Sequence, residues 1–162
     1  CFDWKQKISI RNKSSTADIN QPDDPRSEGI LLHSILSEII QWQDCAVILE
    51  KYHSSSQITK KTFLQFKNVL DRLWQQDDIK YWFNGEGKVR TEVLVLPKSG
   101  DWKRLDRVVI KGKDATVIDF KSGKPKNSDV IQVREYVDLV SEMGYQTEGY
   151  LLYLEDARLL KI

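Results

Sequence analysis

Two aspartates and a lysine on neighbouring predicted strands carry the clearest chemical signal in the sequence. Asp106 lies on the first of these strands, and Asp119-Phe120-Lys121 closes the second. Asp119 and Lys121 are two positions apart, so they share one face of their strand. A carboxylate and an ammonium among apolar neighbours are costly to bury unless something compensates their charge. A divalent metal ion and a phosphate group would do so.

A hairpin is expected to join the two strands, which are predicted at residues 105–110 and 115–121. Residues 111–114 form the connection, and Gly112 stands at its first central position. A glycine there fits a two-residue turn of a primed type, which pairs the first residue of the connection with its last. A four-residue loop over the same segment leads to the same register.

The register of this hairpin sets Asp106 directly opposite Asp119. Directly opposed Cβ atoms on one face of a sheet are about 4.5–5.5 Å apart. Two carboxylates at that separation repel, so they are expected to hold a cation or to retain one proton. With Lys121 beside them they resemble a metal site with a positioned amine. An internal salt-bridge cluster that includes Arg104 explains the hairpin equally well.

The composition suits one compact domain with a hydrophobic core. The chain has 162 residues, 40% of them hydrophobic, and a formal net charge of +1. This net charge does not by itself indicate nucleic-acid binding. Between Asp101 and Lys126, however, there are eight Lys and Arg residues and four Asp residues. A basic rim around an acidic centre suits a polyanion that approaches a metal, whereas a solvated hairpin is the ordinary alternative.

Several function classes lack their sequence signals. The two cysteines, Cys1 and Cys45, do not have the spacing of zinc or iron–sulfur ligands, and nothing indicates a disulfide framework. No segment is apolar enough to cross a membrane, and no secretory signal is visible, so we expect a cytoplasmic protein. No phosphate-binding loop motif is present, so ATP-driven work must reside elsewhere. Because the chain opens with Cys, we expect it to be a piece of a longer polypeptide.

The order of predicted elements indicates a mixed α/β domain with a small central sheet. We expect a single domain over 1–162, with an extended N-terminal arm (1–26, including a strand-like run at 7–11), a helical region (27–80) and a sheet core (86–162). Helices are predicted at 27–43, at 44–52, after a Thr59 cap, and from 127–129 to about 143 before Gly144. Further strands are predicted at 89–96, 149–154 and 158–162.

Three residues on predicted helices could join the site. His33 has Gly29 and Ser37 one turn away, which leaves space beside the imidazole for a metal, although a helical His is more often an ordinary structural group. Gln132 and Tyr136 are four apart and share a helix face. They could contact a phosphate or a base edge, or they could be ordinary boundary residues.

Three further residues are weaker candidates. Glu92, among strand-forming residues, could bind or support the metal, or it could face solvent with Arg90. Trp102 could stack on a base or cover the sheet edge. Lys124 lies in a basic loop at 122–126 and is a candidate DNA contact.

Taken together, these residues resemble the PD-(D/E)XK nucleases. The nearest branch is the RecB/AddA-like nuclease domain at the C-terminus of UvrD/Rep-type helicases. The resemblance runs from Gly29 to the C-terminus and includes the apolar run at 149–154. It rests on the order Gly29-x-x-x-His33, Glu92, Asp106-Arg107, Asp119-x-Lys121 and Gln132-x-x-x-Tyr136.

The resemblance implies a restriction-endonuclease-like α/β core and a set of site roles. His33, Asp106, Asp119 and the backbone carbonyl of Phe120 would hold Mg²⁺ or Mn²⁺. Lys121 would orient or deprotonate the attacking water, and Gln132 and Tyr136 would position DNA. Leu105 stands where the family name has Pro. The four cysteines that hold an iron–sulfur cluster in some relatives are absent, so no such cluster is expected.

The expected function is that of a metal-dependent deoxyribonuclease that hydrolyses phosphodiester bonds. The resemblance favours an exonuclease in DNA end processing and recombinational repair, linked to or associated with a helicase motor. Lys121, Asp119, Asp106 and Glu92 are the candidate catalytic residues. Two alternatives stay open: a catalytically silent module that binds DNA or a partner, and a free-standing site-specific endonuclease.

Overall fold

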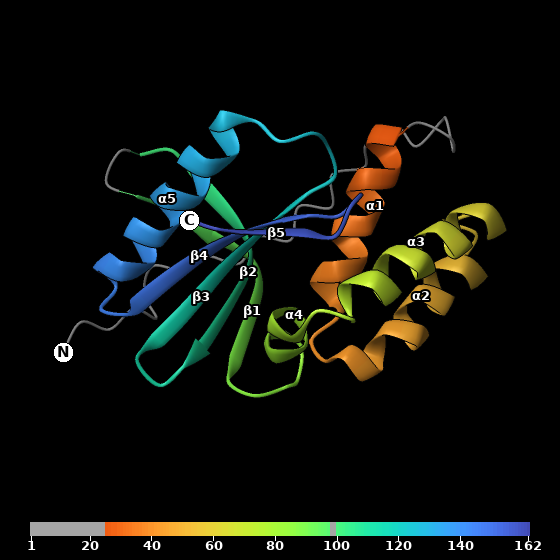
Figure 1. The fold of residues 1–162 in the computed structure, drawn as a ribbon, viewed down its shortest axis with the longest axis horizontal. Helices are drawn as coiled ribbons and strands as arrows, with labels where there is room; N and C mark the ends of the chain where they lie inside the picture. The colour runs from red at the N-terminus through yellow and green to blue at the C-terminus, as the bar shows by residue number, and fades with distance from the viewer. Residues whose placement is uncertain (1–24, 98–99) are drawn as a thin grey trace.

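One five-stranded sheet lies between two helical layers in the computed structural model, which describes residues 25–97 and 100–162 (Figure 1). Residues 1–24 of the predicted arm, including its strand-like run at 7–11, lie outside the described residues. The helices are α1 (Pro25–Glu38), the short 3-10 helix η2 (Trp42–Asp44), α2 (Cys45–Ser54), α3 (Lys60–Leu73), α4 (Asp77–Trp82) and α5 (Asn127–Glu142). The strands are β1 (Lys88–Val95), β2 (Lys103–Lys111), β3 (Asp114–Lys121), β4 (Gln146–Tyr153) and β5 (Arg158–Lys161).

The sheet is mixed, as predicted, and its spatial order follows the chain from β1 to β5. β1, β2 and β3 are antiparallel neighbours, β3 and β4 are parallel, and β5 returns antiparallel to β4. A parallel pair needs a long crossover connection. Helix α5 supplies it, and so α5 lies against the strands that carry the candidate residues.

The predicted hairpin register is confirmed by the β2–β3 ladder. Lys111 pairs with Asp114, and the ladder continues to Arg107 and Ile118. Gly112 has φ +65°, the left-handed conformation that a primed turn requires at its first central position. Asp106 and Asp119 lie one position beyond the last paired residues, at the end of the ladder. The hairpin therefore delivers both carboxylates to the same edge of the paired region.

The two faces of the sheet bury different cores. Helices α1–α4 cover one face, where Ile35 and Leu70 pack with Ile118 of β3. Helix α5 covers the other face and lies very close to β4, because Gly149 has no side chain. A Cβ at Gly149 would lie 2.5 Å from a methyl carbon of Val137. This close approach fixes the height of α5 above the strands.

Helix α1 ends earlier than its sequence predicts. A helix is predicted over residues 27–43, but α1 stops at Glu38. The carbonyls of Ile39 and Ile40 accept hydrogen bonds of 2.7 and 2.9 Å from the buried guanidinium of Arg107. The guanidinium of Arg107 thus replaces the backbone N–H donors that a longer helix would supply. The local sequence around α1 could not predict this, because Arg107 lies on a distant strand.

Other element boundaries follow local signals. Thr59 accepts the N–H of Thr62 at 3.2 Å and caps α3, as predicted. Gly144 has φ +94° and follows the end of α5. Helix α4 was not predicted, because it is only six residues long and shows less than two turns of periodicity. In the described part of the chain, no helix combines the length and apolar character needed to cross a membrane.

Candidate active site

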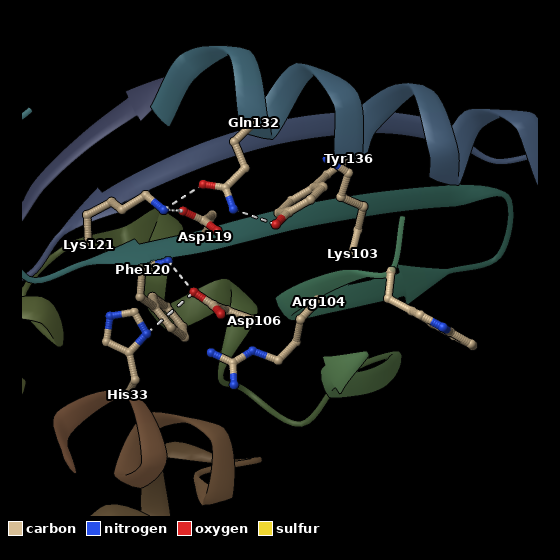
Figure 2. Close-up of a pocket in the computed structure, with 10 residues that line it drawn as sticks. His33, Lys103, Arg104, Asp106, Asp119, Phe120, Lys121, Gln132 and Tyr136 are labelled. Atoms are coloured by element: carbon tan, nitrogen blue, oxygen red, sulfur yellow. Dashed lines mark hydrogen bonds and ion pairs between the residues drawn. The ribbon is translucent and has the colours of Figure 1, made fainter. Parts of the chain in front are cut away.

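A pocket of about 370 Å³ opens where β2, β3, α1 and α5 meet (Figure 2). It gathers residues that are far apart in the chain, and most of them belong to the predicted site. The predicted site residues that line it are His33, Asp106, Asp119, Phe120, Lys121, Gln132 and Tyr136, and the rest of the lining is Trp102, Lys103 and Arg104.

The two aspartates are the most buried charged groups in the pocket. Their side chains are 8% exposed at Asp106 and 3% exposed at Asp119. Burial raises the pKa of Asp106 to about 6, and the backbone N–H of Phe120, 2.9 Å from its Oδ2, opposes that rise. Burial and the charge of Asp106 raise the pKa of Asp119 to about 6. Burial is the main cause of both shifts, and a neighbouring carboxylate raises each pKa further: Glu92 acts on Asp106, and Asp106 acts on Asp119.

Asp119 has an oxygen that is buried and only partly compensated. Its Oδ2 lies 2.7 Å from Nζ of Lys121, on the strand face that the two residues share. The contact is an ion pair without hydrogen-bond alignment, so Oδ2 is buried with no hydrogen-bond donor. Such an oxygen has unused acceptor capacity.

A chain of hydrogen bonds connects Lys121 to helix α5. Nζ of Lys121 donates to Oε1 of Gln132 at 2.8 Å, and Nε2 of Gln132 donates to the hydroxyl of Tyr136 at 2.5 Å. Figure 2 shows this chain running along α5 above the two aspartates. The tyrosine oxygen already accepts a hydrogen bond, so its own proton is available for an acceptor in the pocket.

His33 reaches the pocket from the helical layer on the other side. Its Nδ1 is 3.6 Å from Oδ2 of Asp106, and its ring meets Phe120 edge-on with centroids 6.0 Å apart. Burial lowers the pKa of His33, so the imidazole is neutral at pH 7 and keeps a lone pair. Gly29, one turn earlier, lets α1 come this close, since a Cβ there would lie 2.5 Å from Oγ of Ser122.

The donors are of the kind that a hard divalent cation binds, and Oδ2 of Asp119 has no hydrogen-bond donor of its own. Carboxylate oxygens are the ligands that Mg²⁺ and Mn²⁺ prefer, and a neutral imidazole is compatible with Mn²⁺. Among the described residues, however, no three His, Cys, Asp or Glu side chains lie close enough together to hold a metal ion. The ammonium of Lys121 lies beside Asp119, where a bound metal ion would also have to lie. The pocket thus brings the predicted ligands together without closing them into a complete site.

Two predicted residues lie outside the pocket lining. Glu92 is half-buried on β1 and forms an ion pair with Arg104, its Oε2 3.0 Å from the guanidinium. Lys124 is exposed in the loop after β3 and does not line the pocket. Conversely, Lys103 and Arg104 line it but were not predicted as site residues. Arg104 had a usable signal, because it lies two positions before Asp106 and so shares its strand face.

Comparison with known proteins adds no assignment, since no protein-family model matches the chain and no curated protein is significantly similar to it. The resemblance to PD-(D/E)XK nucleases therefore depends on the residues and contacts described above.

Proposed function

We propose that this chain is a metal-dependent DNA nuclease domain with a restriction-endonuclease-like core. One observation carries the proposal: two buried carboxylates with raised pKa values share a pocket with a lysine that contacts one of them. Buried acids with perturbed pKa values beside a positioned amine are typical of catalytic sites. The mixed sheet with helices on both faces is compatible with this core.

Asp106 and Asp119 would hold Mg²⁺ or Mn²⁺, joined by His33 and the backbone carbonyl of Phe120. When bound, such an ion neutralises the two carboxylates, lowers the pKa of water and stabilises charge on a phosphate. The residues present suit hard oxygen coordination, and no iron–sulfur cluster is proposed.

The chain's own groups would bind and orient the DNA phosphate. Lys121 donates a hydrogen bond to Gln132 and forms an ion pair with Asp119, so its ammonium still has N–H groups for a water molecule or a phosphate oxygen. The free proton of Tyr136 can be donated to a second phosphate oxygen. Lys103 and Arg104 add positive charge at the rim, which attracts the DNA backbone.

The finer proposal is an exonuclease that processes DNA ends in recombinational repair, joined to a helicase motor. It follows from the resemblance in residue order. A free-standing site-specific endonuclease would instead produce a fixed pattern of fragments.

A second candidate is a module that binds DNA or a partner without cutting. The contact between Lys121 and Asp119 favours it, because this ion pair already compensates one carboxylate without a metal. The absence of a three-ligand cluster among the described residues points the same way.

The deciding experiment incubates the purified protein with linear and circular DNA in Mg²⁺, Mn²⁺ or EDTA. We expect metal-dependent loss of the linear DNA, and a loss of at least about 100-fold in rate for Asp119→Asn and for Lys121→Met. Asp138→Asn is the matched control, because Asp138 is exposed on the same helix as Gln132 and does not line the pocket.

The outcomes separate the candidates. Cleavage of linear DNA alone indicates end-dependent action, and discrete fragments from circular DNA indicate a site-specific enzyme. Binding without cleavage in any metal supports the silent module. Wild-type rates in Asp119→Asn would remove Asp119 from the chemistry.

A further inference from the structure

Arg104 lines the pocket from β2, and its guanidinium forms an ion pair with a single carboxylate among the described residues. Lys103 is paired with Glu135 at 2.9 Å. Arg107 is fully buried on the helical side, where it donates to backbone carbonyls. The side chain of Arg104 is 58% exposed, and Figure 2 shows its guanidinium turned toward Asp106 and His33.

Glu92 holds Arg104 in this orientation. Its Oε2 is 3.0 Å from NH1 of Arg104. Within the described ranges, this is the only ion pair or hydrogen bond of the Arg104 side chain. A guanidinium has five N–H donors, so most of them are left for another acceptor. An anion such as a phosphate group could accept the hydrogen bonds of these remaining donors.

The residue that pairs with Arg104 has an unusual backbone conformation. Glu92 has φ +51°, a left-handed conformation that is rare for residues other than glycine. The β1–β2 ladder is paired on both sides of it, at Thr91–Arg107 and Val93–Leu105, so the irregularity is confined to one residue. Strain of this kind collects at functional sites and persists only where surrounding structure imposes it.

We propose that Arg104 binds a phosphate of the nucleic acid in this pocket, with Glu92 as the positioning residue that aims its guanidinium. The planar fork of arginine matches two phosphate oxygens, which a lysine cannot do. This inference rests on the proposed function. In this proposal Glu92 positions the guanidinium of Arg104 and is not a metal ligand.

The first test measures binding of a single-stranded oligonucleotide by fluorescence anisotropy as a function of salt. All proteins carry Lys121→Met to block cleavage, and Mg²⁺ is present. We expect Arg104→Ala to weaken binding about tenfold and to reduce the slope of log K against log[salt] by about 0.7, the value for one phosphate contact on a single strand. Arg104→Lys should restore the slope but only part of the affinity.

Arg90→Ala is the matched control. Arg90 is an exposed arginine on β1 outside the pocket lining, and its guanidinium donates a hydrogen bond to the carbonyl of Val89. It should leave both affinity and slope unchanged. Arg104→Ala behaving like Arg90→Ala, while the parent protein binds DNA, overturns the assignment of Arg104 alone. If neither this parent nor the wild-type protein binds DNA in any metal, the proposed function is overturned as well.

A double-mutant cycle tests the role of Glu92. If Glu92 acts only through Arg104, the combination of Glu92→Gln with Arg104→Ala should be no weaker than Arg104→Ala alone. Glu92→Gly is the second variant, because glycine accepts the positive φ and so keeps the fold while removing the carboxylate. Additive losses, or weaker Mn²⁺ binding by either Glu92 variant in calorimetry, would overturn the positioning role.

Discussion

Asp106 and Asp119 lower the stability of the folded protein at neutral pH. Burial raises the pKa of each carboxyl group to about 6, above the ordinary aspartate value of 3.8, so the folded state holds these protons more tightly than the unfolded state. Their contribution to stability is therefore complete below about pH 4 and is lost as the pH rises through about 6. Because the two carboxylates destabilise the fold at neutral pH, their presence in one pocket indicates a functional use.

The first prediction concerns this pH dependence. Asp119→Asn should raise the free energy of unfolding at pH 8 by about 1–3 kcal/mol, because it removes one of two repelling buried charges. At pH 4 the same substitution should have little effect. Urea denaturation at the two pH values measures the difference, and Asp138→Asn should show none. A variant less stable than wild type at pH 8 would show that the ion pair with Lys121 outweighs the repulsion.

The second prediction concerns metal binding. Mn²⁺ should raise the melting temperature more at pH 8 than at pH 5, because the carboxylates must lose their protons to bind it. His33→Ala should weaken Mn²⁺ binding about tenfold or more in calorimetry. His53→Ala is the matched control, since His53 lies on α2 beside Glu50 and Phe63 and outside the pocket lining. Equal Mn²⁺ affinities in the two variants would remove His33 from the ligands.

At the scale of elements, the site depends on how closely α1 approaches the loop after β3. Gly29 makes this possible, because a Cβ there would lie 2.5 Å from Oγ and 2.9 Å from Cβ of Ser122. His33 lies one turn further along the same helix and meets Asp106 only if α1 keeps this height. The spacing between Gly29 and His33 therefore has a structural reason: the glycine permits the close approach that brings the histidine to Asp106.

The third prediction tests this approach. Gly29→Ala should lower the free energy of unfolding by about 1–3 kcal/mol through overpacking, and it should weaken Mn²⁺ binding by displacing His33. Ser122→Gly removes both clashing atoms, so the double variant should recover most of the loss. Gly123→Ala is the control, because a Cβ there has no heavy atom within 4 Å. A Gly29→Ala protein that binds Mn²⁺ normally would show that α1 can shift without moving the imidazole.

At the scale of the whole molecule, Arg107 ties the helical layer to the sheet. Its guanidinium donates to the carbonyls of Ile39, Ile40 and Trp82 at 2.7–3.0 Å and stacks 3.7 Å from the ring of Phe83. Burial lowers its pKa to about 9. The residues after α1 and at the end of α4 therefore share one buried donor from β2. Because β2 also carries Asp106, this tie sets the position of the pocket relative to α1.

The fourth prediction follows from this arrangement. Arg107→Met should cost about 2–4 kcal/mol of folding free energy, because buried carbonyls lose their donors. Arg90→Met, on the neighbouring strand, should be nearly neutral. Chemical denaturation measures both. If Arg107→Met costs under 1 kcal/mol, these carbonyls must find other donors and the helical layer must be held by its apolar core.

The two cores explain why the pocket can contain so much charge. Apolar side chains fill the space between α1–α4 and the sheet and, separately, between α5 and the sheet. The pocket lies where these two packed regions meet the end of the β2–β3 ladder. Rigid packing on both sides holds the repelling aspartates in place.

Features set by neighbours in the chain could be predicted from the sequence. The turn at Gly112 and the two-residue period placed Asp106 and Asp119 together, and the four-residue period placed Gln132 beside Tyr136. The cap at Thr59 was predictable for the same reason. Each depends on backbone geometry over a few residues, which side-chain type and spacing control directly.

Features set by packing between distant elements could not be predicted in this way. The early end of α1 depends on the guanidinium of Arg107, and the conformation of Glu92 is confined to one residue between paired neighbours. The contact between His33 and Asp106 depends on the height of a helix above a sheet. These contacts join residues that are near in space and far apart in the chain, so their energies depend on the whole packed core. Such contacts produce no periodic pattern in the sequence, and pattern analysis therefore cannot predict them.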